Sequence, residues 1–223
     1  METTSKFKKY LVLGVLFLLP ISIYVFFGTG VDNFGRLPVL VKNVNEVSAF
    51  KDINGDAVQL NERITVLGFF GTDALESKAY TYNLAHKIYS KYQGFEDFQF
   101  LILLPESARN KAKILTANLE TITNTKNWKF AFGAEEEIDT VFKSLNSGYS
   151  LDSNSATPYV FIIDKEMNLR GRNDDEKAKD GMVYGYNSAD VADINNRMTE
   201  DVKVVFAEYR LALKRNNKYK REI

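Results

Sequence analysis

The stretch from Ile64 to Tyr92 constrains the fold of this chain more than any other. It opens with the continuous apolar run Ile64–Phe70, whose β-branched and aromatic residues are typical of a central strand buried on both faces. Gly71 and Thr72 end the run, and a segment with helical periodicity follows. The apolar side of that helix carries Leu84, Ala85, Ile88, Tyr89 and Tyr92. A buried strand, a tight turn and an amphipathic helix form the first half of a βαβ unit. The turn falls at the carboxyl end of the strand, where open α/β sheets usually place their chemistry.

The rest of the chain repeats this alternation of strands and helices. Further strands are predicted at 98–104, 128–132 and 159–163, and a partner strand is predicted around Leu169. Strands at 47–50 and 57–60 are predicted to form a hairpin around Asn54-Gly55-Asp56. Helices are predicted over 108–122, from Glu135 onward, and over 188–215. The apolar positions of the first and last of these helices include Ala112, Ile114, Leu115, Leu119, Ile122, Val191, Ile194, Met198 and Tyr209. The pattern predicts an α/β fold, with a mixed central sheet flanked by helices.

The N-terminal region has the composition of a membrane anchor. Residues 11–28 form a run of 18 residues without charge, close to the roughly 20 needed to cross a bilayer. A cleaved signal peptide is the competing interpretation, but no small-x-small cleavage pattern follows the run. Lys6, Lys8 and Lys9 precede it, so residues 1–10 are expected in the cytoplasm. We expect an uncleaved signal-anchor, a single transmembrane helix at 11–28 in the bacterial inner membrane, a linker at 29–37, and a periplasmic domain.

Composition excludes several classes of function. The chain has 29 basic and 29 acidic residues and a net charge of zero, which argues against a nucleic-acid partner. It has no cysteine, so it has neither disulfides, nor thiol catalysis, nor thiolate metal ligands. Its single histidine, His86, excludes a two-histidine metal site within one chain. The basic tail Lys214–Arg221 is interpreted as a solvated helix end.

A family resemblance rests on four segments of the chain. They are Leu37-Pro38, the stretch from Asn54 to Leu60, the stretch from Ile64 to Thr72, and Tyr159 to Asp164. With the order of elements, they resemble the thioredoxin fold in its membrane-anchored form. More narrowly, they resemble the SCO/SenC family of copper-handling, thioredoxin-like factors in cytochrome c oxidase assembly. The likeness covers most of residues 36–172. It implies a thioredoxin-like domain over 38–187, followed by a long C-terminal helix and basic tail over 188–223.

The chain departs from that family where the chemistry should be. The family places a Cys-x-x-x-Cys pair in the turn after the first central strand, and a histidine just before the last long strand. These positions fall on Ala74, Lys78 and, approximately, Ala156. Copper binding and thiol-disulfide exchange therefore do not carry over, because the ligands are absent. We expect a pseudo-active site with no catalytic residue, no metal and no cofactor.

The turn itself keeps polar side chains that allow two interpretations. Asp73, Glu76 and Lys78 could form a replacement acid-base set. We favour helix punctuation, with Asp73 as N-cap and Glu76 closing a capping box. Thr157-Pro158 lies where thioredoxin-fold proteins often carry a cis-proline.

Other candidate groups have simpler interpretations. The acidic run 174–176 could bind a hard cation, but it has the composition of a solvated loop. Met167, Met182 and Met198 could form a thioether copper site, although Met198 belongs to the apolar stripe of the last helix.

Two functional hypotheses follow. The first is a non-catalytic scaffold or accessory factor for a membrane complex, with protein subunits of a respiratory oxidase as partners. The second is an enzyme, a hydrolase or isomerase, that uses the turn carboxylates. On the first hypothesis, two elements contact the partner: the turn with the proline opposite it, and the long helix. The contact residues expected on this basis are Thr72, Asp73, Leu75, Glu76, Lys78, Pro158 and Tyr209.

Overall fold

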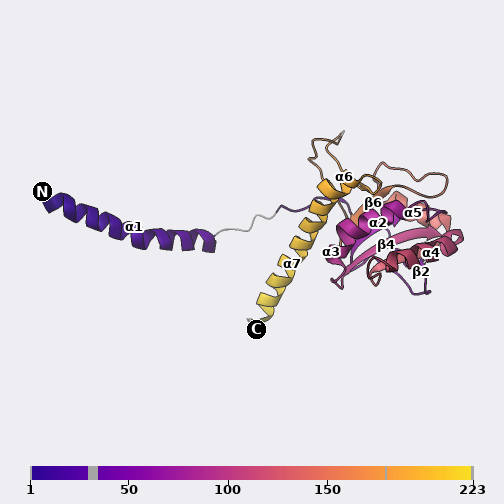
Figure 1. Ribbon diagram of the computed structural model, residues 1–223, viewed down its shortest axis with the longest axis horizontal. Helices are drawn as coiled ribbons and strands as arrows, with labels where there is room; N and C mark the ends of the chain where they lie inside the picture. The colour runs from indigo at the N-terminus through magenta and orange to yellow at the C-terminus, as the bar shows by residue number, and fades with distance from the viewer. Residues whose placement is uncertain (1, 30–34, 179, 222–223) are drawn as a thin grey trace. The chain divides into compact units, whose positions relative to one another are not determined.

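The chain divides into two units, residues 1–35 and residues 36–223 (Figure 1). The computed structural model describes residues 2–29, 35–178 and 180–221. Most of the expected linker, residues 30–34, lies outside the described residues. Each unit is therefore described by itself.

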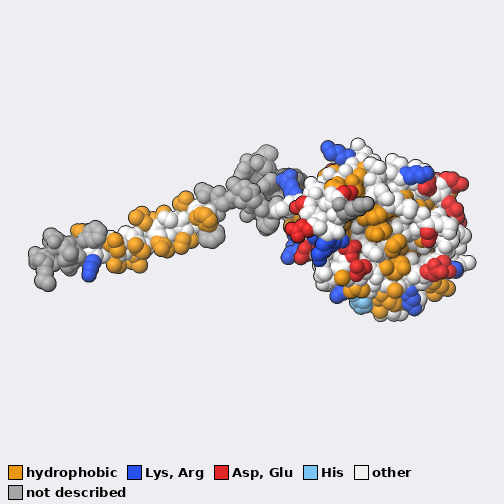
Figure 2. Space-filling view, turned by 90° about the horizontal axis from the view of Figure 1, so that it is seen from above, with side chains coloured by type: hydrophobic (Ala, Val, Ile, Leu, Met, Phe, Trp, Pro, Cys, Tyr) orange, Lys and Arg blue, Asp and Glu red, His pale blue; other side chains and the backbone are white. Residues whose placement is uncertain are grey.

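The first unit is a single helix, α1 (Glu2–Thr29). Its segment Lys8–Phe26 is long and apolar enough to cross a membrane by length and composition. Figure 2 shows apolar side chains along the visible face of this segment, and none of it is buried against protein. An apolar surface of this extent is stable in water only if something covers it, which agrees with the expected anchor.

The second unit is built on a mixed sheet of eight strands within the described residues. The strands are β1 (Val39–Val41), β2 (Lys51–Asp52), β3 (Ile64–Phe69), β4 (Phe98–Pro105), β5 (Trp128–Gly133), β6 (Tyr159–Ile163), β7 (Leu169–Arg170) and β8 (Tyr186–Asn187). Their order across the sheet is β1-β7-β6-β3-β4-β5-β2, and β8 pairs with β6 outside that path. Strands β3, β4 and β5 are parallel, and the other pairs are antiparallel. The predicted mixed sheet is confirmed, with β3 at its centre.

Helices cover both faces of the sheet (Figure 1). They are α2 (Lys78–Leu84), the π-helical turn η1 (Ala85–Tyr89), α3 (Ser90–Tyr92), the 3-10 turn η2 (Glu106–Ala108), α4 (Arg109–Glu120), α5 (Glu135–Ser144), α6 (Val191–Asp193), the π-helical turn η3 (Ile194–Met198) and α7 (Thr199–Arg221). One face packs against α2–η1–α3, α4 and α6–η3–α7, and the other packs against α5 and the loop 44–60. Successive residues of β3 alternate between these faces, with Val66 on the first and Leu67 on the second. Because both faces are covered, every residue of β3 is buried, as its composition predicts.

The hairpin predicted at 47–60 is wrong in its strands. Residues 47–50 are not a strand, and β2 pairs with β5 and makes only a single bridge, Lys51 to Ala57, within the hairpin. The turn is there, because the Asp52 carboxylate accepts the N–H groups of Asn54 and Asp56 at 2.9 and 3.0 Å. On the first side of the turn the buried residues are Val47 and Phe50, while Ala49 between them is exposed. A spacing of three does not fit the two-residue period of a strand.

Three apolar positions assigned to buried helix faces are exposed. Ile114 and Ile122 are 54% and 42% exposed, and Val191 is 47% exposed. The buried stripe of α4 runs through Ala112, Leu115 and Leu119, so Ile114 lies about 100° away from it on the helix.

Candidate functional site

The turn at the carboxyl end of β3 is held closely against the segment that precedes β6. Phe70 forms a β-bridge with Ala156, the Thr72 N–H donates to the Asn154 carbonyl at 3.0 Å, and the Thr157 N–H donates to the Phe69 carbonyl at 3.0 Å. These contacts bring together the two places where the resembled family carries its cysteines and its histidine.

Two residues allow this close approach. Gly71 has φ +67°, and a Cβ placed there would lie 2.7 Å from the Ala156 Cβ and in contact with the Asn154 carbonyl oxygen. Glycine alone avoids both the left-handed strain and the clash. Opposite it, one oxygen of the Asp152 carboxylate accepts the N–H groups of Asn154 and Ala156 at 2.8 and 2.9 Å. We call the contact between residues 69–72 and residues 154–157 the turn latch.

Pro158 follows the latch directly. The described chain contains no cis peptide bond, so the Thr157-Pro158 bond is trans. The Pro158 carbonyl accepts both the N–H and the hydroxyl of Ser188, at 2.8 and 2.6 Å. Pro158 is half-buried and lies at the same end of the sheet as the turn.

The turn side chains divide into buried and exposed groups. Ala74, at one of the family's cysteine positions, is fully buried in the core. Leu75 is half-buried and packs against the same core, whereas Glu76 and Lys78 are exposed. The surface of the turn is therefore charged at its rim and apolar only at its base.

Asp73 does not cap the helix, so the expected capping box is wrong. Helix α2 begins at Lys78, and its N-cap position, Ser77, makes no capping hydrogen bond through its side chain. Asp73 instead accepts the Leu75 N–H at 3.2 Å and pairs with Lys111 of α4. The hydrogen bond from Lys111 is the main cause that lowers the pKa of Asp73. The sequence gives no signal for Lys111, because it is 38 positions away from its partner.

Tyr209 lies at the other end of the sheet from the turn. Its hydroxyl donates to Glu166 at 2.6 Å and accepts the Lys165 N–H at 3.2 Å, in the turn between β6 and β7. That turn adjoins the amino end of β3, since Thr65 pairs with Ile163. Burial, followed by the hydrogen bond to Glu166, raises the pKa of Tyr209. Tyr209 and the β3 turn are therefore separate places on the molecule.

A second polar cluster fixes α7 to the sheet close to Tyr209. Arg170 of β7 pairs with Glu208 at 2.7 Å and with Asp164 at 3.2 Å, and its side chain is 7% exposed. The backbone of Leu37 joins it, because the Leu37 N–H donates to Glu208 at 2.8 Å and its carbonyl accepts from Arg170 at 2.8 Å. We call the cluster of Arg170, Asp164, Glu208 and the Leu37 backbone the Arg170 clamp. It ties the start of the domain to its last helix.

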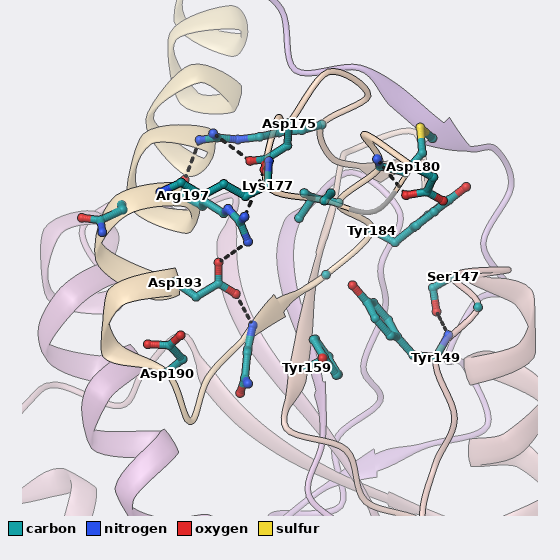
Figure 3. A pocket seen from close by; sticks show the side chains of 18 of the residues that line it. Ser147, Tyr149, Tyr159, Asp175, Lys177, Asp180, Tyr184, Asp190, Asp193 and Arg197 are labelled. Atoms are coloured by element: carbon teal, nitrogen blue, oxygen red, sulfur yellow. Dashed lines mark hydrogen bonds and ion pairs between the residues drawn. The ribbon is translucent and has the colours of Figure 1, made fainter.

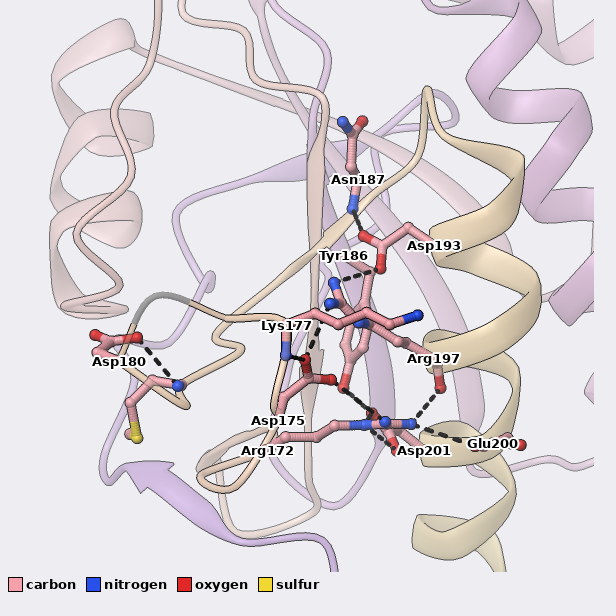
Figure 4. A network of polar contacts seen from close by, with 11 residues as sticks. Arg172, Asp175, Lys177, Asp180, Tyr186, Asn187, Asp193, Arg197, Glu200 and Asp201 are labelled. Atoms are coloured by element: carbon pink, nitrogen blue, oxygen red, sulfur yellow. Dashed lines mark hydrogen bonds and ion pairs between the residues drawn. The ribbon is translucent and has the colours of Figure 1, made fainter.

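The acidic run 174–176 is not simply a solvated loop. Asp175 pairs with Arg197 at 3.0 Å and Arg172 at 3.5 Å, and its side chain is 6% exposed (Figure 4). Arg172 also holds Asp201 at 2.8 Å, and the Tyr186 hydroxyl donates to the same carboxylate at 2.7 Å. The hydrogen bond to Asp201 is the main cause that raises the pKa of Arg172. This network holds the loop after β7 against η3 and α7.

The remaining candidates are not brought together. Met198 packs in the core on one face of the sheet, and Met167 packs against the core on the other, so the three methionines cannot share a metal. His86 is exposed. Among the described residues, no group of three or more His, Asp or Glu side chains is placed to hold a metal ion.

Comparison with solved structures identifies the fold, whereas comparison of the sequence with other proteins does not. No family model matches the sequence, and no curated protein matches it. A protein of Aquifex aeolicus VF5 assigned to electron transfer is 16% identical, with 74% of this chain and 92% of that chain aligned and a TM-score of 0.52. A protein of Bacteroides thetaiotaomicron assigned as a disulfide isomerase is 11% identical, with 77% and 94% aligned and a TM-score of 0.52.

A third structure bears on the family that the sequence resembles. BsSco, described as a member of the Sco family of cytochrome c oxidase assembly proteins, is 15% identical, with 74% and 92% aligned and a TM-score of 0.51. At this level of identity the likeness establishes the fold. The second unit of the chain has a thioredoxin-like fold, as predicted.

Proposed function

We propose that this thioredoxin-like protein is a membrane-anchored, non-catalytic scaffold or accessory factor for assembly of a respiratory complex such as cytochrome c oxidase. The observation that carries the proposal is the turn latch. It preserves the close approach of the β3 turn and the segment 154–158, while Ala74, Lys78 and Ala156 stand where the resembled family has its copper ligands. A surface shaped to receive a polypeptide remains, without the groups that would react with it.

The anchor supports the same proposal. α1 contains a span long and apolar enough for a membrane, with lysines before it, and BsSco is described as an oxidase assembly factor. We place α1 in the bacterial inner membrane, residues 1–10 in the cytoplasm and the thioredoxin-like domain in the periplasm. A domain tethered in this way meets the subunits of membrane complexes at high effective concentration.

The ion pair of the turn supports a structural role over a catalytic one. Asp73 is engaged by Lys111, and its lowered pKa keeps it ionised at neutral pH, so it is not available as a proton donor. Neither of the two cavities described in the domain includes a residue of the turn.

We propose that the partner contacts two separate places. The first is the rim of the turn, formed by Thr72, Asp73, Leu75, Glu76, Lys78 and Pro158. The second is the outer part of α7 beginning at Tyr209. Interface energy is usually concentrated in a few anchors, and exposed rim charges mainly set association rate and specificity. Leu75 is the apolar anchor of the first contact, and the ring of Tyr209 is the anchor of the second.

The test is co-purification of partner subunits from membranes solubilised in mild detergent, with the full chain as bait. The charge swap Glu76→Lys with Lys78→Glu keeps net charge and alters only exposed side chains of the turn. The matched control is Lys91→Glu with Glu96→Lys, an exposed pair near the amino end of β4. We expect the turn swap, and not the control, to lower the yield of oxidase subunits identified by mass spectrometry.

The same experiment separates the second contact. Tyr209→Phe removes only the hydroxyl, whereas Tyr209→Ala removes the ring, and we expect only the latter to lower the yield. Circular dichroism establishes that each variant is folded. Leu75→Asp replaces the apolar anchor of the turn. If both this variant and the turn swap are folded and recover the same subunits in the same yield as the wild type, the turn is refuted as a docking surface.

A further inference from the structure

A groove of about 1010 Å³ lies apart from the β3 turn. It is bounded by the loop after α5 and the start of β6 on one side, and by residues of the described segments 172–178 and 180–197 on the other (Figure 3). Its volume is at the upper end of the range of about 300–1,000 Å³ typical of small-molecule sites. The groove is thus large enough for several residues of an extended peptide.

One wall of the groove is aromatic. The rings of Tyr149 and Tyr159 stack with centroids 4.0 Å apart and planes inclined by 8°. Both rings are half-buried, and Tyr184 lies beside them at the groove (Figure 3). Their hydroxyls make no hydrogen bond to any residue that the structure describes. A half-exposed tyrosine pair offers a π surface that attracts cations.

The opposite wall is charged, with an excess of carboxylates. Arg197 lies between Asp193, at 3.1 Å, and Asp175, at 3.0 Å, so one cation is shared by two anions. Asp190 is exposed; one of its carboxylate oxygens accepts the Ala192 N–H at 2.8 Å, and the other bonds none of the described residues. Of the described residues that line the groove, six are acidic and three are basic.

The two walls are close enough to interact electrostatically. Burial is the main cause that raises the pKa of Tyr149, followed by the neighbouring Tyr159 and the negative charge of Asp193. Arg197 acts in the opposite direction and does not cancel the increase. The charged side chains of the opposite wall therefore act on the Tyr149 ring.

We propose that this groove binds a basic, extended peptide segment of a partner protein. An arginine or lysine side chain of the partner lies with its stem along Tyr149 and Tyr159 and its charged group toward Asp190 and Asp193. The excess of carboxylates over basic side chains disfavours a polyanion as occupant, and the described residues provide no cluster that would hold a metal ion. The inference goes beyond the proposed function, because the groove includes no residue of the β3 turn.

The test is fluorescence anisotropy with the full chain in detergent micelles. The probe is a fluorescein-labelled peptide of alternating arginine and glycine, and the control probe replaces arginine with glutamate. We expect the arginine probe to bind and its affinity to fall when salt is raised from about 0.05 to 0.5 M, because exposed charges are screened. We expect no binding of the glutamate probe.

Two variants locate the binding. Asp190→Asn removes a charge and keeps an N-cap residue of equal quality, and Tyr149→Leu removes the π surface. Each should weaken binding of the arginine probe by about 2–5-fold, as exposed cation–π contacts and surface charge pairs usually do. Glu136→Gln, on the exposed side of α5, removes one charge away from the groove and should leave the affinity unchanged.

The proposal fails if the wild type does not bind the arginine probe, or if it binds the glutamate probe equally well. It also fails if Asp190→Asn and Tyr149→Leu each bind the arginine probe as tightly as the wild type. Circular dichroism monitors folding. If Tyr149→Leu does not fold, the proposal is tested by comparing the affinity of Asp190→Asn for the arginine probe with that of Glu136→Gln. None of these variants alters the turn, so the outcome is independent of the co-purification experiment.

Discussion

The turn latch predicts that alanine at Gly71 is much more damaging than alanine at another glycine with positive φ. Gly71 has φ +67° and Gly55 has φ +89°, so both substitutions place a side chain in the left-handed region. That strain is about 1–2 kcal/mol, partly offset by about 0.4–1 kcal/mol from the less flexible unfolded chain. Gly55 has open space around it, whereas a Cβ at Gly71 would lie 2.7 Å from the Ala156 Cβ and against the Asn154 carbonyl. Overpacking of this kind adds about 1–3 kcal/mol.

Urea unfolding of the full chain in detergent measures the difference. The single tryptophan, Trp128, is 4% exposed and stacks on Phe100 in the core, so its fluorescence reports unfolding of the thioredoxin-like domain. With a slope of about 2 kcal/mol per M, the midpoint of Gly71→Ala should fall about 0.5–1.5 M below that of Gly55→Ala. Equal midpoints would refute the close approach of the two segments, since only that contact distinguishes the two sites.

Four further predictions concern the rest of the molecule. Arg170→Met leaves two carboxylates of the clamp without a cation and should lower the free energy of unfolding by about 3–5 kcal/mol in the same urea assay; a loss below about 1 kcal/mol would contradict the clamp. Burial raises the pKa of Asp175, but the Lys177 N–H and the neighbouring arginines outweigh it, so the pKa in the folded protein is lowered. The ionised Asp175 therefore stabilises the fold above its unfolded pKa of about 3.9, and this stabilisation is lost as pH falls through the lower pKa of the folded protein. Asp175→Asn should therefore destabilise the chain at pH 7, and a difference from wild type that persists unchanged at about pH 2 would contradict this. The full chain should stay with membranes after carbonate washing, and its release would exclude α1 as an anchor. The full chain in detergent should retain no copper with better than roughly micromolar affinity, and stoichiometric copper after dialysis against a weak chelator would reveal a missed site.

Local sequence was sufficient to define the central part of the fold. The apolar runs of β3, β4 and β6 are long and rich in β-branched or aromatic residues, so no other assignment buries them as well. The helix of residues 78–92 carries its apolar side chains at helical spacing, and Leu84, Ile88 and Tyr89 are all fully buried. The absence of cysteine also follows from sequence alone. Burial and periodicity are local properties, and they are readable without contacts.

Pairing between distant side chains was decided only by the tertiary structure. Asp73 meets Lys111 across 38 positions, and Arg172 meets Asp201 across 29, and neither spacing has a periodicity that a sequence can display. The sequence assigned Asp73 to a helix cap because a capping box is a local pattern, whereas the approach of α4 gives it a partner through space. The groove beside Tyr149 and the placement of Tyr209 far from the turn depend in the same way on how β6, α5 and α7 pack. Periodicity determines which face of an element is buried, and packing determines which polar groups meet.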